Sequence, residues 1–221
     1  MALRLINGLF YYDHVLDIDN QALIDEIIAT KESPKGEYNK SRPHPYDVDM
    51  QHTFYEDVPL KEETFDLLNK KISEVTSQIF KIPNAMSCTE VWGHLVPPGE
   101  QTMIHNHDDG ERIGLSWVYY PHMPDKSGNL HFVSQTDTQR IMWEIKSTPG
   151  TLYLFSSNVL HFTPRNASNE TRVSISGNTI ASLELKSIIQ NDVEFKNNYW
   201  YFVGRSGENT LSEDGEEEKD N

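Results

Sequence analysis

The sequence has little cysteine, no long apolar run and a shortage of basic residues. Cys88 is the one cysteine among 221 residues, so no disulfide framework can form within the chain, and we expect a reducing, cytoplasmic setting. No stretch approaches the roughly eighteen uninterrupted apolar residues of a membrane-spanning helix. Polar residues interrupt the partly apolar segment 1–15, where we expect a strand and not a signal peptide.

The charge is unevenly distributed and strongly acidic. Aspartate and glutamate outnumber lysine and arginine by 34 to 19, which gives a net charge of −15. Residues 212–221 hold a concentrated share of this charge and no apolar side chain, so we expect a disordered acidic tail over about residues 206–221. An acidic body argues against nucleic-acid partners and against binding to anionic membranes, because both require basic surface.

Two amphipathic segments in the first third of the chain predict helices over about residues 17–82. Asp17 or Asp19 can cap the first helix. Its apolar residues, at helical spacing, are Leu23, Ile24, Ile27 and Ile28. The second stripe is Phe65, Leu68, Ile72, Val75 and Ile79, at steps of three and four residues between Pro59 and Pro83.

From Thr89 onward, short runs rich in β-branched and aromatic residues alternate with turn residues. They predict strands near 89–96, 101–107, 113–121, 129–133, 140–146, 150–157, 171–180 and 198–203. About eight such strands favour a sandwich or barrel over residues 89–203, with the two helices packed on one face. An all-parallel α/β fold is disfavoured, because no helical pattern separates the strands. We therefore expect one mainly β domain with flanking helices over residues 1–205.

Three histidines form the first candidate site. His105 and His107 lie two residues apart at a strand end, so both side chains point to the same face. His161, which follows the apolar run 151–157, is the best candidate for a third metal ligand. A second solution uses His107, Asp109 and His161, since two histidines and one carboxylate form the facial triad of non-haem iron oxygenases. The spacing leaves both ligand sets open.

Histidine pairs are also common in ordinary structure, where they are exposed or hydrogen-bonded. Six further histidines lie elsewhere in the chain, and His94 and His131 fall within predicted strands as candidate core or surface residues. The metal interpretation therefore needs support from a different kind of residue.

Arg172 supplies that support. The turn-rich segment 162–170 can return the chain as a hairpin, so we expect Arg172 to lie beside the strand carrying His161. Alternation sends Arg172 and Ser174 to one face, and Val173 to the other. An arginine inside a barrel requires a carboxylate partner, which it binds through two parallel hydrogen bonds. The alternative is an outward Arg172 that pairs with the acidic surface.

Taken in order, these motifs resemble the 2-oxoglutarate/iron(II) oxygenases. The quoted features are the His105–Asp109 segment, Leu115-Ser-Trp-Val-Tyr-Tyr120, Pro149-Gly-Thr-Leu-Tyr-Leu-Phe155, His161 and Arg172-Val-Ser-Ile-Ser176. More narrowly, the chain is similar to a small group of prolyl-hydroxylase-like oxygenases common in phage and marine microbial genomes. The resemblance covers about residues 89–181.

The resemblance implies a double-stranded β-helix, which is a jelly-roll or cupin-like barrel, supported by the N-terminal helices. It implies iron(II) held by His105, His107 and His161, with Pro98-Gly99 at the usual distance before the first ligand. His107 then stands where similar enzymes have a carboxylate, and Asp109 is the rival ligand to His105. Arg172 and Ser174 would bind the distal carboxylate of 2-oxoglutarate.

The activity implied is hydroxylation of a C–H bond, with O2 consumed and succinate and CO2 released. The substrate would be a small molecule or a peptide, and the sequence does not identify it. The loop 33–52 and several aromatic residues (Trp92, Trp117, Trp143 and the run 199–202) are candidates to contact it, although a connector role for the loop and a core role for the aromatic residues explain them better. Two other classes fit less of the pattern: a cupin-like zinc or nickel barrel without 2-oxoglutarate chemistry, and a non-catalytic degenerate barrel.

Overall fold

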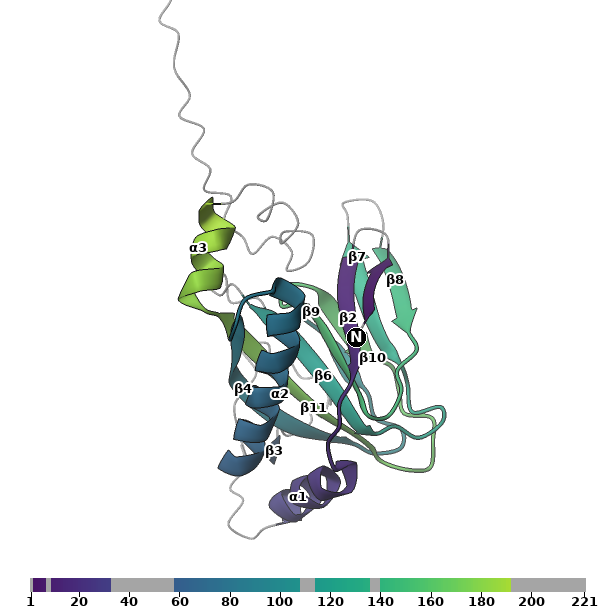
Figure 1. The fold of residues 1–221 in the computed structure, drawn as a ribbon. Helices are drawn as coiled ribbons and strands as arrows, with labels where there is room; N and C mark the ends of the chain where they lie inside the picture. The colour runs from purple at the N-terminus through teal and green to yellow at the C-terminus, as the bar shows by residue number, and fades with distance from the viewer. Residues whose placement is uncertain (1, 7–8, 33–57, 108–113, 136–139, 192–221) are drawn as a thin grey trace, which may run out of the picture.

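Two antiparallel sheets face each other in the computed structural model, which describes residues 2–6, 9–32, 58–107, 114–135 and 140–191 (Figure 1). The larger sheet has the order β1-β2-β9-β6-β11-β4-β3 and the smaller one β5-β10-β7-β8. The larger sheet consists of β1 (Ala2–Ile6), β2 (Leu9–Val15), β3 (Val58–Pro59), β4 (Met86–Val96), β6 (Leu115–His122), β9 (Thr151–Ser156) and β11 (Arg172–Ala181). The smaller sheet consists of β5 (Thr102–His105), β7 (Leu130–Gln135), β8 (Arg140–Ile145) and β10 (Leu160–Thr163).

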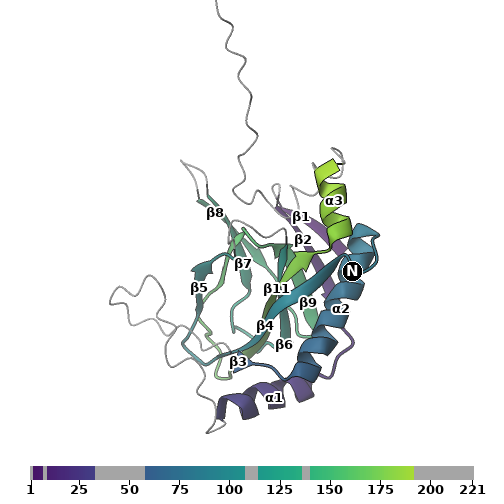
Figure 2. The same ribbon diagram turned by 90° about the vertical axis from the view of Figure 1, so that its left-hand side faces the viewer.

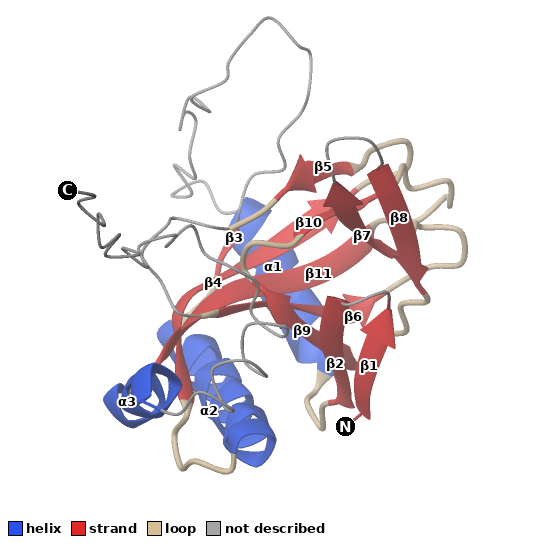
Figure 3. Cartoon of the chain, turned by 90° about the horizontal axis from the view of Figure 1, so that it is seen from above, coloured by secondary structure: helices blue, strands red, loops and turns tan. Residues whose placement is uncertain are grey.

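Helices α1 (Asn20–Glu32) and α2 (Glu62–Phe80) cover the outer face of the larger sheet, where they contact β4 and β6 (Figure 2). Seen from above, α2 and α3 (Leu183–Asn191) lie on the side away from the smaller sheet (Figure 3). The predicted mainly β fold with flanking helices is confirmed, and the barrel is a double-stranded β-helix.

The helix ends explain how α1 and α2 hold together. Asp19 Oδ1 accepts hydrogen bonds from the backbone N–H groups of Gln21 (3.0 Å) and Ala22 (3.1 Å), so Asp19 and not Asp17 caps α1. Helix α2 has no such residue of its own. Instead, the Glu26 carboxylate of α1 accepts from the Lys61 N–H and the Thr64 hydroxyl, at 2.6 Å each. This carboxylate lies at the positive end of the α2 dipole.

Two apolar clusters lie on opposite sides of the larger sheet. One joins the helix stripes, which include Ile27, Leu68 and Ile72, to the outer face of the sheet. The other fills the barrel interior and includes Tyr120, Phe132 and Phe155. Alternation along each strand of the larger sheet therefore sends one residue to the helices and the next into the barrel.

The predicted strands coincide with observed ones except at the C-terminal side of the barrel. The segment 160–163 forms a separate strand, β10, which carries His161 and was not predicted. Residues 9–15 and 2–6 form two paired strands in place of the single expected one, and α3 follows β11 without a sequence prediction. The predicted strand at 198–203, the loop 33–52 and the acidic tail lie outside the described residues.

One prediction of strand neighbours is wrong. We expected Arg172 to lie beside the strand carrying His161, but that strand, β10, pairs with β5 and β7, whereas β11 pairs with β4 and β6. The two strands belong to opposite sheets. The turn residues between them build an arch across the barrel and not a hairpin, because both strands are already paired on each side. No described helix is long and apolar enough to cross a membrane.

Candidate functional site

Three imidazoles meet on the inner side of the smaller sheet. His105 at the end of β5 pairs directly with His161 on β10, and His107 follows two residues beyond His105. Their ring centroids are 4.3 Å (His105–His161), 5.0 Å (His105–His107) and 5.1 Å (His107–His161) apart. One potential ligand atom from each ring lies within 4.8 Å of the others. This separation suits three ligands around a single small metal ion.

Backbone carbonyls set the orientation of two of these rings. The Nδ1–H of His105 donates to the Met103 carbonyl at 2.7 Å, and that of His161 donates to the Val159 carbonyl at 2.8 Å. Each bond fixes the neutral tautomer that keeps the Nε2 lone pair available, which is the arrangement typical of metal-binding histidines. The edge of Phe155 packs on His161 at a centroid distance of 4.7 Å and restricts it further.

Burial keeps the three imidazoles neutral. It lowers the pKa of His107 to about 3, lowers that of His161 well below its ordinary value, and lowers that of His105. Mutual repulsion adds to this effect, because the His105 charge lowers the pKa values of both His107 and His161. Only a neutral imidazole can bind a metal ion, so the site is ready for a metal at neutral pH.

Arg172 is buried in the same barrel interior, with only 1% of its surface exposed. Its guanidinium crosses to the smaller sheet, where Nη2–H donates to the Thr163 hydroxyl at 2.5 Å. Nη1–H groups donate to the carbonyls of Ser127 and Gly128. The outward orientation that we considered from the sequence is therefore wrong. Ser174, also buried, lies two residues along β11 on the same face.

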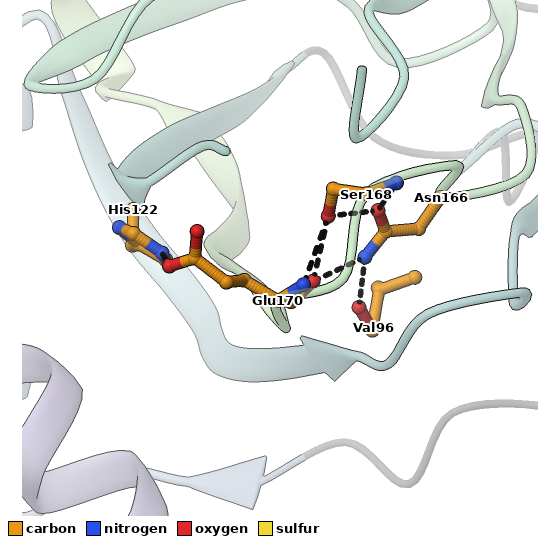
Figure 4. A network of polar contacts seen from close by, with 5 residues as sticks. All are labelled: Val96, His122, Asn166, Ser168 and Glu170. Carbon is orange, nitrogen blue, oxygen red and sulfur yellow. Dashed lines mark hydrogen bonds and ion pairs between the residues drawn. The ribbon is translucent and has the colours of Figure 1, made fainter. Parts of the chain in front are cut away.

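The arch between β10 and β11 is held by Asn166, which is 1% exposed (Figure 4). Its side-chain N–H groups donate to the carbonyls of Val96 (2.9 Å) and Glu170 (2.8 Å), and its side-chain oxygen accepts from Ser168. Its backbone pairs with Gly99 and Glu100, which precede β5. This one residue thus connects the segments that lead to His105 and to Arg172 with the segment that follows His161.

Sequence reasoning missed several residues of this site. Thr163 shares a face with His161 by alternation, and that signal was available. The sequence could not indicate the carbonyls of Ser127 and Gly128 as partners of Arg172, because every residue type has a backbone carbonyl. His94 was grouped with ordinary strand histidines, yet it faces the barrel interior opposite Ser174. Trp117, a candidate pocket residue, is instead core on the helix side. Asp109 lies outside the described residues.

The comparisons with known proteins agree with this geometry. Residues 90–178 match the family described as "Putative 2OG-Fe(II) oxygenase". That segment spans most of β4 to most of β11 and includes all three histidines and Arg172. The match confirms the resemblance inferred from the sequence. It indicates a 2-oxoglutarate-dependent oxygenase, for which the family implies iron(II), 2-oxoglutarate and O2. No curated protein matches the chain.

Solved structures share the fold at low sequence identity. AviO1 from Streptomyces viridochromogenes Tue57 has a TM-score of 0.58 and 13% identity over 78% of this chain and 90% of that one. The non-haem α-ketoglutarate-dependent carbocyclase SnoK from nogalamycin biosynthesis has a TM-score of 0.53 and 11% identity, over 77% of this chain and 79% of that one. The viral collagen prolyl hydroxylase from Paramecium bursaria Chlorella virus 1 has a TM-score of 0.50 and 16% identity, over 78% of this chain and 90% of that one. At these identities the likeness establishes the fold alone.

Proposed function

We propose, starting from the barrel of a 2-oxoglutarate-Fe(II) oxygenase, that the chain hydroxylates a C–H bond of a peptide or small molecule and releases succinate and CO2. One observation carries the proposal: three neutral imidazoles and a buried arginine occupy the same barrel interior. Neither feature alone requires this chemistry. Together they provide a place for a metal and a place for the distal carboxylate of an oxo acid.

The histidine set fits iron(II). Imidazole is a suitable ligand for iron, and three ligands on one side leave positions open for other groups. When bound, iron(II) supplies the activation of O2 that is coupled to decarboxylation of the oxo acid. His105, His107 and His161 would hold it through neutral nitrogens, with the tautomers of His105 and His161 fixed by backbone carbonyls. The ligand set His105/His107/His161 is favoured here over one with Asp109, because its members converge.

Arg172 and Ser174 would bind the distal carboxylate of 2-oxoglutarate. The partner of Arg172, Thr163, lies two residues from His161 on β10, which corresponds to about 7 Å along a strand. A five-carbon dicarboxylate can therefore chelate the metal at one end and approach the arginine with the other. The buried positive charge of Arg172 and that of a divalent metal both favour a dianion over a monocarboxylate.

The substrate would approach from the side of His105 and His107. Both are partly exposed, whereas His161 is buried. The partly buried Trp92 lies beside His107, with ring centroids 5.7 Å apart. Trp92 thus forms one wall next to the metal position, on the side open to a substrate C–H bond.

An anaerobic titration with iron(II) and then 2-oxoglutarate tests the proposal. We expect the visible charge-transfer band of the metal–oxo acid chelate, and succinate release once O2 is admitted. His161→Ala should abolish metal binding and the band. Arg172→Gln should keep the metal but weaken 2-oxoglutarate binding by about a hundred-fold, since it removes a buried charge-assisted contact worth about 3 kcal/mol.

Matched variants settle the ligand set and provide the control. His105→Ala and Asp109→Ala separate the two ligand alternatives: we expect only His105→Ala to reduce metal affinity. His131→Ala removes an imidazole on the outer face of the same sheet, where it stacks on Phe162, and should leave both affinities unchanged. Tight metal binding with no response to 2-oxoglutarate would instead indicate the cupin-like alternative.

A further inference from the structure

A fourth imidazole lies in the barrel beside the candidate metal position. His94 is on β4, directly opposite Ser174 on β11, so its side chain faces the same interior as Ser174 and Arg172. Its Nδ1 atom is buried. The histidine and arginine charges that act on its pKa are those of His105, Arg172 and His107, so His94 lies near both the candidate metal ligands and the arginine.

Trp92 fixes the protonation pattern of this ring. The indole Nε1–H can only donate, and it donates to Nε2 of His94 at 2.6 Å. Nε2 must therefore carry the lone pair. Burial lowers the pKa of His94 to about 3, so the ring is neutral and its single proton resides on Nδ1. The two rings meet edge to face, at a centroid distance of 6.1 Å, which holds the imidazole plane in place.

The result is a fixed N–H donor in the interior where the oxo acid would lie. In the function proposed above, Arg172 and Ser174 bind the distal carboxylate of 2-oxoglutarate. The other end carries a carboxylate next to the metal, and an anion in a buried site needs N–H donors. His94 lies in the same interior, opposite Ser174 and near His105, His107 and Arg172. A neutral donor suits this position, because it adds no further positive charge beside a divalent metal.

We propose that His94 is a binding residue for 2-oxoglutarate, whose Nδ1–H donates to the carboxylate at the metal end, and that Trp92 is the positioning residue that keeps the proton on Nδ1. The proposal rests on the function proposed above and extends it by a residue and a role. It distinguishes the two ends of the co-substrate: Arg172 holds one carboxylate and His94 the other.

Two substitutions at His94 separate the effect of losing the Nδ1–H donor from the effect of changing the shape of the side chain. His94→Gln can place an acceptor near the original Nε2 and so keep Trp92 satisfied, but it lacks the donor at Nδ1. His94→Asn can place an amide N–H at the Nδ1 position. We expect His94→Gln to weaken 2-oxoglutarate binding to the iron(II) protein by about ten- to a hundred-fold, the effect of losing a hydrogen bond to a charged group. His94→Asn should stay within a few-fold of the original protein.

Pyruvate identifies the carboxylate involved, because it has the oxo acid end and no distal carboxylate. In anaerobic titrations followed by the charge-transfer band, His94→Gln should weaken the binding of pyruvate and the binding of 2-oxoglutarate by similar factors. Arg172→Gln should weaken 2-oxoglutarate alone. If His94→Gln weakens only 2-oxoglutarate, or leaves both unchanged, the proposal is wrong. The proposal is also wrong if the His94→Asn variant binds 2-oxoglutarate as weakly as the His94→Gln variant.

Trp92→Phe tests the positioning role. Phenylalanine keeps an aromatic ring beside His107 but removes the indole N–H. We expect unchanged iron(II) affinity, a several-fold weaker oxo acid complex and a shifted charge-transfer band, because the imidazole can then protonate either nitrogen. An unshifted band with unchanged affinity would contradict the role of Trp92. Failure of the original protein to bind 2-oxoglutarate would overturn the proposed function itself. If the original protein binds 2-oxoglutarate and the His94 variants bind it equally well, this inference alone would be overturned.

Discussion

Arg172 shows how a single buried side chain depends on its backbone neighbours. Its guanidinium reaches the carbonyl of Gly128, where the chain turns with φ of +92°. A Cβ atom at Gly128 would lie 2.7 Å from the Pro164 carbonyl oxygen and 3.1 Å from Arg172 Nη1. Glycine at this position therefore gives both the turn and the space that the arginine occupies.

Gly128→Ala should consequently affect stability and co-substrate binding together. We expect a loss of about 1–3 kcal/mol in the free energy of unfolding from backbone strain and the contact with Pro164. A displaced Arg172 should weaken 2-oxoglutarate binding without changing metal affinity. Urea unfolding and anaerobic titration measure the two effects.

Gly99→Ala is the matched control for that substitution. Gly99 also has a positive φ, of +87°, but a Cβ atom there would meet nothing within 4 Å. It should therefore show the strain without the loss of 2-oxoglutarate affinity. Equal effects of the two substitutions on binding would contradict the link between Gly128 and Arg172.

At the scale of elements, the arch between β10 and β11 decides whether the metal and co-substrate positions face each other. His161 lies before the arch and Arg172 after it, on strands of opposite sheets. Asn166 fastens the arch to Val96 at the end of β4 and, through its backbone, to the segment before β5. The sequence Asn166-Ala-Ser168 matches a glycosylation pattern, but its amide is buried and hydrogen-bonded within the protein.

Asn166→Ala should loosen the arch. Two carbonyls would lose their donors, so we expect a loss of about 1–3 kcal/mol in the free energy of unfolding. Binding of both iron(II) and 2-oxoglutarate should weaken, because the arch joins the strands that carry both sites. Asn169→Ala is the control, since Asn169 is exposed in the same arch and such substitutions usually change stability by about 0.5 kcal/mol or less. Equal stability of the two variants would contradict this role for Asn166.

At the scale of the whole molecule, the cluster of neutral histidines inside the barrel makes stability depend on pH. Burial lowers the pKa values of His94 and His107 to about 3, below the value of about 6.5 expected in the unfolded chain. The unfolded state therefore binds more protons as the pH falls below about 6.5. The resulting stability is fully present above pH 6.5 and is lost progressively down to about pH 3.

The metal-free protein should thus lose stability steeply in mild acid. Each such group contributes a slope of about 1.4 kcal/mol per pH unit in that window. Urea unfolding between pH 7 and 4 should show a smaller slope for His107→Gln than for the original protein. His131→Gln, on the outer face of the smaller sheet, serves as the control for loss of a histidine. Identical slopes for the original protein and His107→Gln would contradict the assignment.

Much of this protein is determined by local sequence. The helix stripe from Phe65 to Ile79, a capping aspartate before the first helix and the shared strand face of Arg172 and Ser174 all follow from periodicity and side-chain chemistry. The spacing of His105 and His107 at one strand end predicted that their side chains share a face, and Arg172 was needed beside it to favour a metal site. These features depend on residues that are neighbours along the chain, so their physical causes can be recognised without the fold.

Other features were decided only by tertiary structure. His161 lies on its own strand, and Arg172 faces it from the opposite sheet, because strand pairing across the barrel depends on contacts between residues far apart in sequence. The carbonyls that hold Arg172, and the hydrogen bond from Trp92 that sets the tautomer of His94, involve groups that carry no sequence signal of their partner. The sequence determined which chemical groups the barrel would hold, and the fold decided which of them meet.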